Sequence, residues 1–262
     1  MKKYLLILMV LLVSCEEEKT FADDIVLSFP NHTMMKIQRF NEDANEEGEN
    51  LMYKGKFKTD INVKYFKNIY PEPLPPPKYN ETQIDHNERI KKLNDSIDNI
   101  KNFYFRNERL KILDTEEDLT DFLSNRNLLI IIKEKDTIPL YKMDYGTKKI
   151  QAYKAYPIYI KNISTKILKI PIDASGVALY ITNDIQFQFI RNSNYIICGM
   201  ETNLNPYFEL KPNEILIYSF PHLENGSKRK AKIVFFKAFS KEFEISIDEK
   251  IIKNQRSTHY LK

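Results

Sequence analysis

The segment Tyr156-Pro157-Ile158-Tyr159-Ile160-Lys161 is the first of a series of short, apolar segments that fill the C-terminal part of this 262-residue chain. Polar turn sequences such as Asn162-Ile163-Ser164 and Lys211-Pro212-Asn213 separate these segments. Short strands with turns about every 8–12 residues are typical of antiparallel sandwiches. We therefore predict an immunoglobulin-like antiparallel β-sandwich over residues 151–252, followed by a tail at 253–262. The predicted strands are Tyr156–Lys161, Ile167–Ile172, Val177–Thr182, Ile185–Ile190, Tyr195–Cys198, Ile215–Phe220, Lys232–Phe236 and Phe243–Ile247.

The preceding residues, 51–150, predict a smaller region of mixed helix and strand, so the chain as a whole is expected to be α+β. Apolar residues alternate with polar ones from Phe57 to Tyr65, which indicates a half-buried strand. The segments Leu128–Ile132 and Thr137–Tyr141 flank a polar tetrapeptide and predict a β-hairpin.

Between these strands lie a proline-rich segment at 71–77 and an amphipathic helix predicted at 84–112. The prolines favour a stiff polyproline II spacer; recognition by a proline-binding partner is the alternative. The helix has an apolar stripe at spacings of three and four residues, from Ile90 to Tyr104. This stripe is too short for a coiled coil. The helix is therefore expected to cover its own domain or to dock on a partner.

The amino terminus has the pattern of an export signal. Lys2 and Lys3 precede ten apolar or aromatic residues, Tyr4–Val13. A helix of that length spans only about 15 Å, half of a bilayer core. No later segment has 18 consecutive apolar residues, so we expect no transmembrane helix in the mature protein.

The signal-like segment ends in Leu12-Val13-Ser14-Cys15, which resembles the lipobox of bacterial lipoproteins. The resemblance implies that residues 1–15 are a lipoprotein signal peptide including the acylated Cys15. In that family the cysteine receives a diacylglycerol, the peptide is cut before it, and the new amine is acylated, typically with palmitate. Membrane lipid would then be a partner, because several acyl chains anchor a protein stably. An ordinary signal peptide beside a chance cysteine is the alternative.

Residues 16–50 are expected to form an acidic tether and loop. Glu16-Glu17-Glu18-Lys19 resembles the export tag of surface-exposed lipoproteins of Bacteroidota-type bacteria; a solvated tether is the alternative. The resemblance implies an outer-membrane, lipid-anchored protein on either the surface or the periplasmic face. If Cys15 is lipidated, Cys198 has no intramolecular partner.

Five C-terminal segments resemble the C-terminal half of uncharacterised envelope lipoproteins of Bacteroidota-type bacteria. The resemblance supports the location and the sandwich fold, and it implies no activity. The segments are Ala155–Asn162, Cys198-Gly199, Leu210–Glu214, Phe220-Pro221 and Phe243–Ile245.

The sequence offers little chemistry. Six glycines cannot be arranged as either of the common phosphate-binding loops. His32, His86, His222 and His259 are far apart in sequence, unlike a zinc motif. Cys198 with His222 as base is a nucleophile only if folding joins them; an inert thiol is the alternative. The acid pairs at 42–43 and 46–47 lie in loop-like sequence.

These observations predict a lipid-anchored cell-envelope protein, most simply a non-catalytic binding or structural module with a protein or glycan ligand. No catalytic, metal-binding or cofactor-binding residue is assigned. After processing, the net charge of about +2 is too small to indicate a nucleic-acid partner. The main alternative is an inhibitor or immunity-type lipoprotein that acts on an envelope effector enzyme. A hydrolase would require Cys198 or a histidine in a cleft against a carboxylate.

Overall fold

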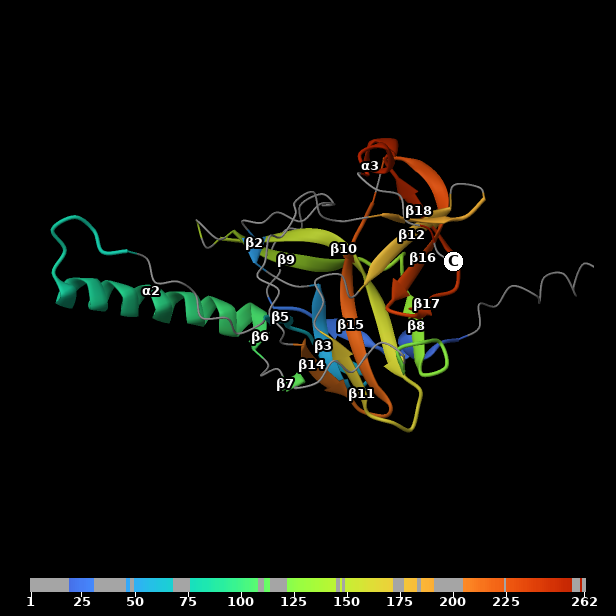
Figure 1. Ribbon diagram of the computed structural model, residues 1–262, viewed down its shortest axis with the longest axis horizontal. Helices are drawn as coiled ribbons and strands as arrows, with labels where there is room; N and C mark the ends of the chain where they lie inside the picture. Colours follow the sequence, from blue (N-terminus) through green and yellow to red (C-terminus); the bar gives the residue numbers. More distant parts are fainter. Residues whose placement is uncertain are drawn as a thin grey trace, which may run out of the picture.

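The computed structural model describes residues 19–30, 46–47, 50–67, 76–107, 111–113, 122–144, 147, 149–171, 177–182, 185–190, 205–223, 225–255 and 260. These residues form a mostly β structure with a small helical part (Figure 1). The predicted α+β class, with a β-sandwich-type fold, is therefore confirmed.

The main sheet is built around one long strand, β10 (Ile150–Asn162). One edge of β10 pairs with β15, which pairs in turn with β3; the other edge pairs with β8 and β9, and β2 extends β9. All of these pairings are antiparallel. The strands are β2 (Glu46–Glu47), β3 (Leu51–Lys56), β8 (Leu128–Ile132), β9 (Ile138–Asp144) and β15 (Glu214–Pro221).

The predicted hairpin of β8 and β9 is wrong. Both strands pair with the same edge of β10, β8 with its C-terminal part and β9 with its N-terminal part. The chain therefore continues in the same direction through the turn, where Asp136 donates its N–H to the carbonyl of Lys133 at 3.1 Å. Polar turn residues mark a break in a strand, but they do not specify whether the chain reverses. The length of β10 decides this, because it can pair with two strands in succession.

A second sheet has the order β13-β12-β16-β17, and β18 also pairs with β16. A third, smaller sheet has the order β11-β14-β7. The strands are β7 (Lys111–Leu113), β11 (Leu168–Pro171), β12 (Ala178–Thr182), β13 (Phe187–Ile190), β14 (Asn205–Leu210), β16 (Ser227–Phe235), β17 (Ala238–Phe239) and β18 (Phe243–Ile247). Most of the predicted C-terminal strands are therefore present, and β14 and β17 are additional.

The main sheet is buried on both faces, which explains why β15 is apolar at every position from Ile215 to Phe220 except Ser219. Leu216 and Phe220 belong to a core shared with the second and third sheets. Ile215 and Ile217 point the other way, into a second core. An asparagine at φ 60°, Asn213, makes the turn into β15, at the turn predicted from Lys211-Pro212-Asn213.

The second core is closed by residues near the amino terminus. The 3-10 helix η1 (Phe21–Asp24) and β1 (Val26–Ser28) lie there, and β1 pairs in parallel with β4 (Asp60–Asn62). Ala22 of η1 is buried in this core. Residues expected to belong to a tether thus pack against the main sheet. The main sheet also takes strands from both sides of the boundary expected at residue 150.

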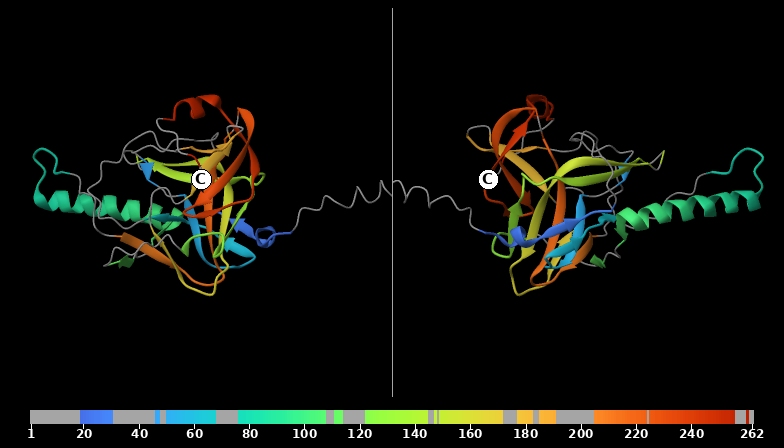
Figure 2. Two further views of the ribbon diagram at one scale, coloured as in Figure 1. Left: turned by 45° about the vertical axis from the view of Figure 1, so that its right-hand side comes forward. Right: turned by 180° about the vertical axis from the view of Figure 1, so that it is seen from behind.

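The helix α2 (Gln83–Tyr104) projects from the β structure and does not lie over either of the large sheets (Figures 1 and 2). It ends eight residues before the predicted position, because the next residues pair with other strands. These strands are β6 (Phe105–Asn107), which pairs in parallel with β5 (Tyr65–Lys67), and β7, which pairs with β14. A short helix, α3 (Glu249–Lys253), follows β18.

Within the part of the chain that the structure describes, no helix is both long and apolar enough to cross a bilayer. Several predictions fall outside the described residues. These are the signal segment with Cys15, the acidic run 16–18, most of the proline-rich segment 71–77, and the predicted strand Tyr195–Cys198.

Candidate functional site

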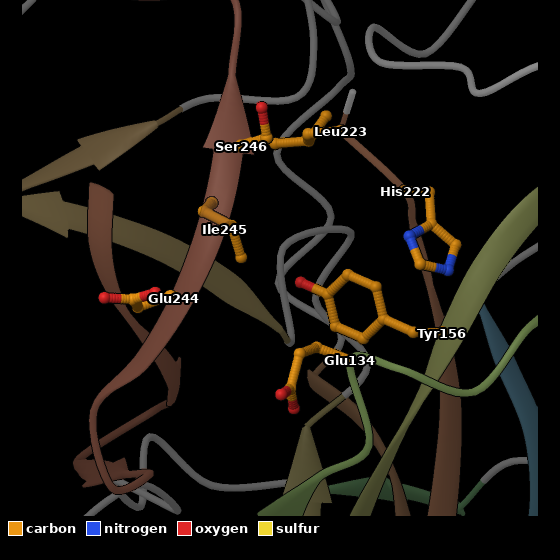
Figure 3. Close-up of a pocket in the computed structure, with 7 residues that line it drawn as sticks. All are labelled: Glu134, Tyr156, His222, Leu223, Glu244, Ile245 and Ser246. Atoms are coloured by element: carbon orange, nitrogen blue, oxygen red, sulfur yellow. The ribbon is translucent and has the colours of Figure 1, made fainter. Parts of the chain in front are cut away.

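A pocket of about 110 Å³ lies between β18 and the end of the main sheet (Figure 3). It combines residues that are far apart in the sequence. One wall comes from β10, from the end of β15 and from the turn between β8 and β9, and the opposite wall comes from β18. Its lining residues are Glu134, Tyr156, His222, Leu223, Glu244, Ile245 and Ser246.

Tyr156 is the most unusual residue of the pocket. Its side chain projects from β10 with 2% of the residue exposed, and its ring packs against Phe220, His222 and Phe243. Its hydroxyl group is buried and has no hydrogen-bond partner among the residues that the structure describes. A buried hydroxyl without a partner loses about 1–3 kcal/mol relative to one that is hydrogen-bonded. The pocket is therefore lined by a residue whose buried hydroxyl is left without a partner by the described residues.

The electrostatics of the pocket keep this hydroxyl neutral. Burial, with a smaller contribution from the negative charge of Glu134, raises the pKa of Tyr156 well above its ordinary value. Glu134 itself is half-buried in the turn between β8 and β9. No ion pair of Glu134 occurs among the described residues, and its carboxylate points away from His222 (Figure 3).

His222 holds the turn between β8 and β9 against the end of β15. Its Nε2 lies 3.3 Å from the backbone oxygen of Asp136, and its backbone N–H donates to the carbonyl of Lys154 at 3.1 Å. Because a carbonyl oxygen can only accept, Nε2 donates in this contact, and Nδ1 is the second nitrogen of the ring. In Figure 3 that second nitrogen lies on the side of the Tyr156 hydroxyl.

The opposite wall, β18, is an edge strand: within the described residues it pairs only with β16. The carbonyl of Ile233 in β16 accepts the backbone N–H of Ser240 at 2.9 Å. Ser240 lies between β17 and β18, so the backbone groups of Ile233 point toward these two strands. The backbone N–H and C=O groups of successive residues in a strand point to opposite edges. Those of Ala231, two residues before Ile233, therefore also point toward β18, and Ala231 forms a hydrogen-bonded pair with Phe243. The backbone N–H and C=O of Glu244, and likewise of Ser246, therefore point away from β16.

The side chains of β18 also alternate. Ile245 turns toward Tyr156, whereas the carboxylate of Glu244 turns away from it (Figure 3). Glu244 lines the pocket nevertheless, so it presents its main chain there. The pocket thus joins an open strand edge to an unpartnered hydroxyl.

A serine nucleophile is not assembled here. Ser246 donates its hydroxyl to the carbonyl of Gly226 at 2.8 Å and accepts from the backbone N–H of Gly226 at 3.1 Å. In Figure 3 its hydroxyl points away from His222. The hydrogen bond of His222 goes to a backbone carbonyl rather than to a carboxylate.

His86 lies elsewhere, near the start of α2. Its Nδ1 lies 3.2 Å from a carboxylate oxygen of Glu81, and Arg89 donates to the same carboxylate at 2.6 Å and 2.8 Å. The arginine hydrogen bonds, followed by one from the backbone N–H of Lys78, hold the pKa of Glu81 well below its ordinary value. This cluster ties the residues before α2 to the helix.

The other residues considered from the sequence are not brought to the pocket by any described contact. Glu46–Glu47 form β2. Cys15, His32, Cys198, His259 and the acid pair 42–43 lie outside the described residues. Among the residues that the structure does describe, no cluster of three or more histidine, cysteine or acidic side chains could hold a metal ion.

Sequence reasoning missed Tyr156 and Glu134 as site residues. Tyr156 lies in a predicted strand, where an aromatic residue is ordinary. Nothing in the local sequence shows that its hydroxyl would lack a partner, because that depends on β18, almost 90 residues later in the chain.

No protein-family model matches this chain, and comparison with curated proteins and with solved structures gave no significant match. Its function is therefore inferred from the sequence motifs and from the geometry of the pocket.

Proposed function

We propose that the protein is a lipid-anchored binding module of a bacterial cell envelope, and that it binds an extended segment of a protein partner along the open edge of β18. The observation that carries the binding role is the pocket itself, where outward-pointing backbone groups of an edge strand lie beside an unpartnered hydroxyl. An added strand satisfies such backbone groups, and pockets beside the edge select its side chains. A protein segment fits better than a glycan, because a second main chain supplies both N–H and C=O groups.

The anchoring role rests on the lipobox-like sequence at Cys15. The structure adds a distance constraint, because the chain is fixed to the body only a few residues later. Phe21 packs edge-on against Phe57 and Tyr159, and Asp23 forms an ion pair with Lys133. Thr20 is five positions after Cys15, so the chain between them spans at most about 18 Å. An acylated Cys15 would therefore hold the β structure close to the membrane.

Anchoring is tested by fractionating cells that express the full chain. The Cys15→Ala variant is expected in the soluble fraction, and the Cys198→Ala control is expected to stay with the membranes. Membrane retention of Cys15→Ala would contradict the anchor. In cells expressing the wild-type chain, protease treatment from outside would then distinguish the surface from the periplasmic face.

Strand addition is tested by two substitutions of the same residue. The N–H of Glu244 points away from β16, so Glu244→Pro removes it without breaking a hydrogen bond of the sheet. Glu244→Ala removes the carboxylate and keeps the N–H. The probe is a displayed library of random decapeptides, selected on the full-length Cys15→Ala chain. Selected peptides are expected to bind the Ala variant and to lose affinity for the Pro variant.

Two results would refute this use of the edge. Peptides that bind the Pro variant as well as the wild-type chain would place binding elsewhere. A chain that dimerises by itself, with the dimer lost in Glu244→Pro, would assign the edge to a second copy. Sedimentation analysis of the same samples measures that outcome.

The end of α2 favours a second function, inhibition of an envelope enzyme. Because α2 has 22 residues, it is about 33 Å long, and its Gln83 end lies on the side of the molecule opposite η1 (Figure 2). Near that end two apolar side chains are unusually exposed, Tyr79 at 95% and Ile84 at 73%. A rigid projection with an apolar tip is suited to enter a cleft.

The test uses a photo-crosslinking residue at position 79, with one at position 126 as the control. Inhibition is supported if position 79 captures an envelope enzyme that the wild-type chain inhibits and a Tyr79→Ala, Ile84→Ala double variant does not. Equal inhibition by that variant would refute a role for the tip.

A further inference from the structure

We propose that one end of the main sheet docks on the membrane, with its apolar and lysine side chains in the phospholipid headgroup layer. This inference rests on the proposed lipid anchor and adds the surface by which the anchored protein lies against the bilayer. At this end β3 and β10 stop, and β8 and β15 start. Lys56 of β3 lies opposite Glu214 of β15, and Asn162 of β10 lies opposite Leu128 of β8.

Three turns lie side by side at this end. The turn after β10 is joined to the turn before β8, because Ile163 donates its N–H to the carbonyl of Asn127 at 2.9 Å. It is joined to the turn before β15 by the N–H of Asn213, which donates to the carbonyl of Asn162 at 3.0 Å. We call this surface the anchor face. It consists of residues 56–58, 122–129, 161–167 and 211–213.

The proposed anchor enters the β structure at this face. Phe21 of η1 packs edge-on against Phe57, with ring centroids 6.4 Å apart, and the Nζ of Lys161 lies 5.4 Å from the centroid of the Phe21 ring. Phe21 is six positions after Cys15, so the chain between them spans at most about 22 Å. Acyl chains on Cys15 would therefore hold the anchor face close to the headgroups.

The anchor face is rich in exposed apolar side chains. Twelve large apolar side chains of the described residues are exposed, and five of them belong to this face. Apolar groups that enter the boundary between headgroups and acyl chains are removed from water, which favours binding to the surface of a bilayer. The five are Phe57, Phe122, Leu129, Ile163 and Ile167.

Lysine side chains lie beside the exposed aromatic rings. The Nζ of Lys161 is 5.8 Å from the centroid of the Phe57 ring, and the Nζ of Lys166 is 5.4 Å from that of Phe122. A lysine at a bilayer surface keeps its stem against apolar groups and its ammonium among the polar headgroups. Each ring with its lysine therefore matches the boundary between acyl chains and lipid phosphates.

The charge of the anchor face suits lipid phosphates as well. Its residues include five lysines, one arginine and no acid. The neighbouring acids Asp23 and Asp24 are already paired with Lys133 and Lys19. The six basic residues outnumber the three glutamates at 16–18, which lie between the face and the proposed anchor.

Docking at this face leaves the pocket beside β18 open to a partner. The eight-residue strand β15 begins at the anchor face with Glu214 and ends near the pocket with Pro221, a length of about 25 Å. In Figure 1 the anchor face lies toward the bottom of the β structure and β18 near the top. The two surfaces would thus serve separate roles, one on the membrane and one away from it.

The experiment uses the lipidated full-length chain in vesicles of phosphatidylethanolamine and phosphatidylglycerol. In the Cys198→Ala background, a single fluorescently labelled cysteine replaces either Ile163 in the anchor face or Ile84 near the tip of α2. Both isoleucines are exposed, so the two labels are matched. Lipids with a quencher in the headgroup are expected to quench the label at 163 several-fold more strongly than the label at 84.

Further variants, labelled at position 163, identify the contacts. Lys56→Gln with Lys58→Gln should lower the ratio of docked to undocked chain about 5-fold for each lysine. Phe122→Ser with Ile167→Ser should lower it about 10-fold or more, because two apolar side chains are lost. Lys228→Gln with Lys230→Gln is the matched control, since these lysines pair with β18, away from the anchor face. Thermal unfolding of each variant shows whether the fold is intact.

The outcomes separate this inference from the proposed anchor. Retention on the vesicles with equal quenching at 163 and 84, or with stronger quenching at 84, would overturn docking and leave the anchor standing. Self-association in detergent that is lost in the Phe122→Ser, Ile167→Ser variant would assign the face to a second copy and overturn docking. If the vesicles do not retain the chain, the anchor fails and the docking assignment fails with it.

Discussion

The substitution Tyr156→Phe, which removes one oxygen atom, is expected to make the protein more stable. The hydroxyl of Tyr156 is buried, and no described residue is its hydrogen-bond partner. Phenylalanine keeps the ring, and with it the contacts to Phe220 and Phe243, whose centroids lie 5.5 Å and 6.3 Å away. The gain is the desolvation penalty of the lost hydroxyl, about 1–3 kcal/mol.

The assay is equilibrium unfolding in urea, with thermal unfolding as a second measurement. For a chain of this size, 1 kcal/mol corresponds to about 2–4 °C in Tm. Tyr141→Phe is the matched control, because its hydroxyl donates to the carbonyl of Pro30 at 2.8 Å. That variant should lose about 0.5–1.5 kcal/mol, the usual net contribution of a hydrogen bond.

The same substitution should change the response to alkaline pH. In the folded state the pKa of Tyr156 is raised above its ordinary value of 10.0 by burial and by the charge of Glu134. Above pH 10 the unfolded chain loses this proton and the folded chain keeps it, so stability falls as pH rises. Tyr156→Phe removes this contribution, and the fall above pH 10 should be less steep.

One result would refute this reasoning. If Tyr156→Phe is destabilised as much as Tyr141→Phe, the hydroxyl has a hydrogen-bond partner in solution.

Three further predictions concern structural residues. Asn162→Ala should lower stability by about 2–4 kcal/mol in urea unfolding, because the buried Asn162 amide donates to the carbonyls of Lys166 and Leu210. Gly226→Ala should lower it by about 1–3 kcal/mol, since a Cβ there would lie 1.8 Å from a backbone oxygen of β18; unchanged stability would mean that this turn can shift. The pKa of Glu81 is lowered in the folded state, so its ionised carboxylate stabilises the start of α2 above about pH 4.5, and this contribution is lost as pH falls below that value. Amide hydrogens at the start of α2 should therefore exchange faster below about pH 4.5, whereas those of β10 should stay protected. Glu81→Gln should remove this pH dependence, and a wild-type tip that exchanges equally at both pH values would contradict it.

The residues of the long strand show what local sequence predicts well. β10 and β15 were placed correctly because β-branched and aromatic residues fill them, and because Lys211-Pro212-Asn213 marks the turn before β15. Asn162 was expected in a turn; it is the last residue of β10, and its side chain accepts from the N–H of Ser164 in the turn that follows. The Asn162 side chain forms hydrogen bonds with Lys166, Leu210 and Ser164. The bond to Leu210 could not be predicted, because Leu210 belongs to β14 of the third sheet and meets Asn162 only after folding.

The candidate site was much less predictable. His222 attracted notice only as an isolated histidine, and Tyr156 not at all. A hydroxyl is unpartnered only in relation to everything that surrounds it, and here the surroundings come from β18, β15 and the turn before β9. No local pattern contains that information.

The sequence by itself determined most of the C-terminal strands, where a helix begins, and that its first residues resemble an export signal ending in Cys15. Only the tertiary structure decided that β8 and β9 share one edge of β10, that α2 stops at Tyr104, and that an open strand edge lies beside Tyr156. The physical reason is the range of the interactions. Periodicity and turn chemistry act between neighbours in sequence, whereas strand pairing and the burial of a polar atom depend on segments that meet only after folding.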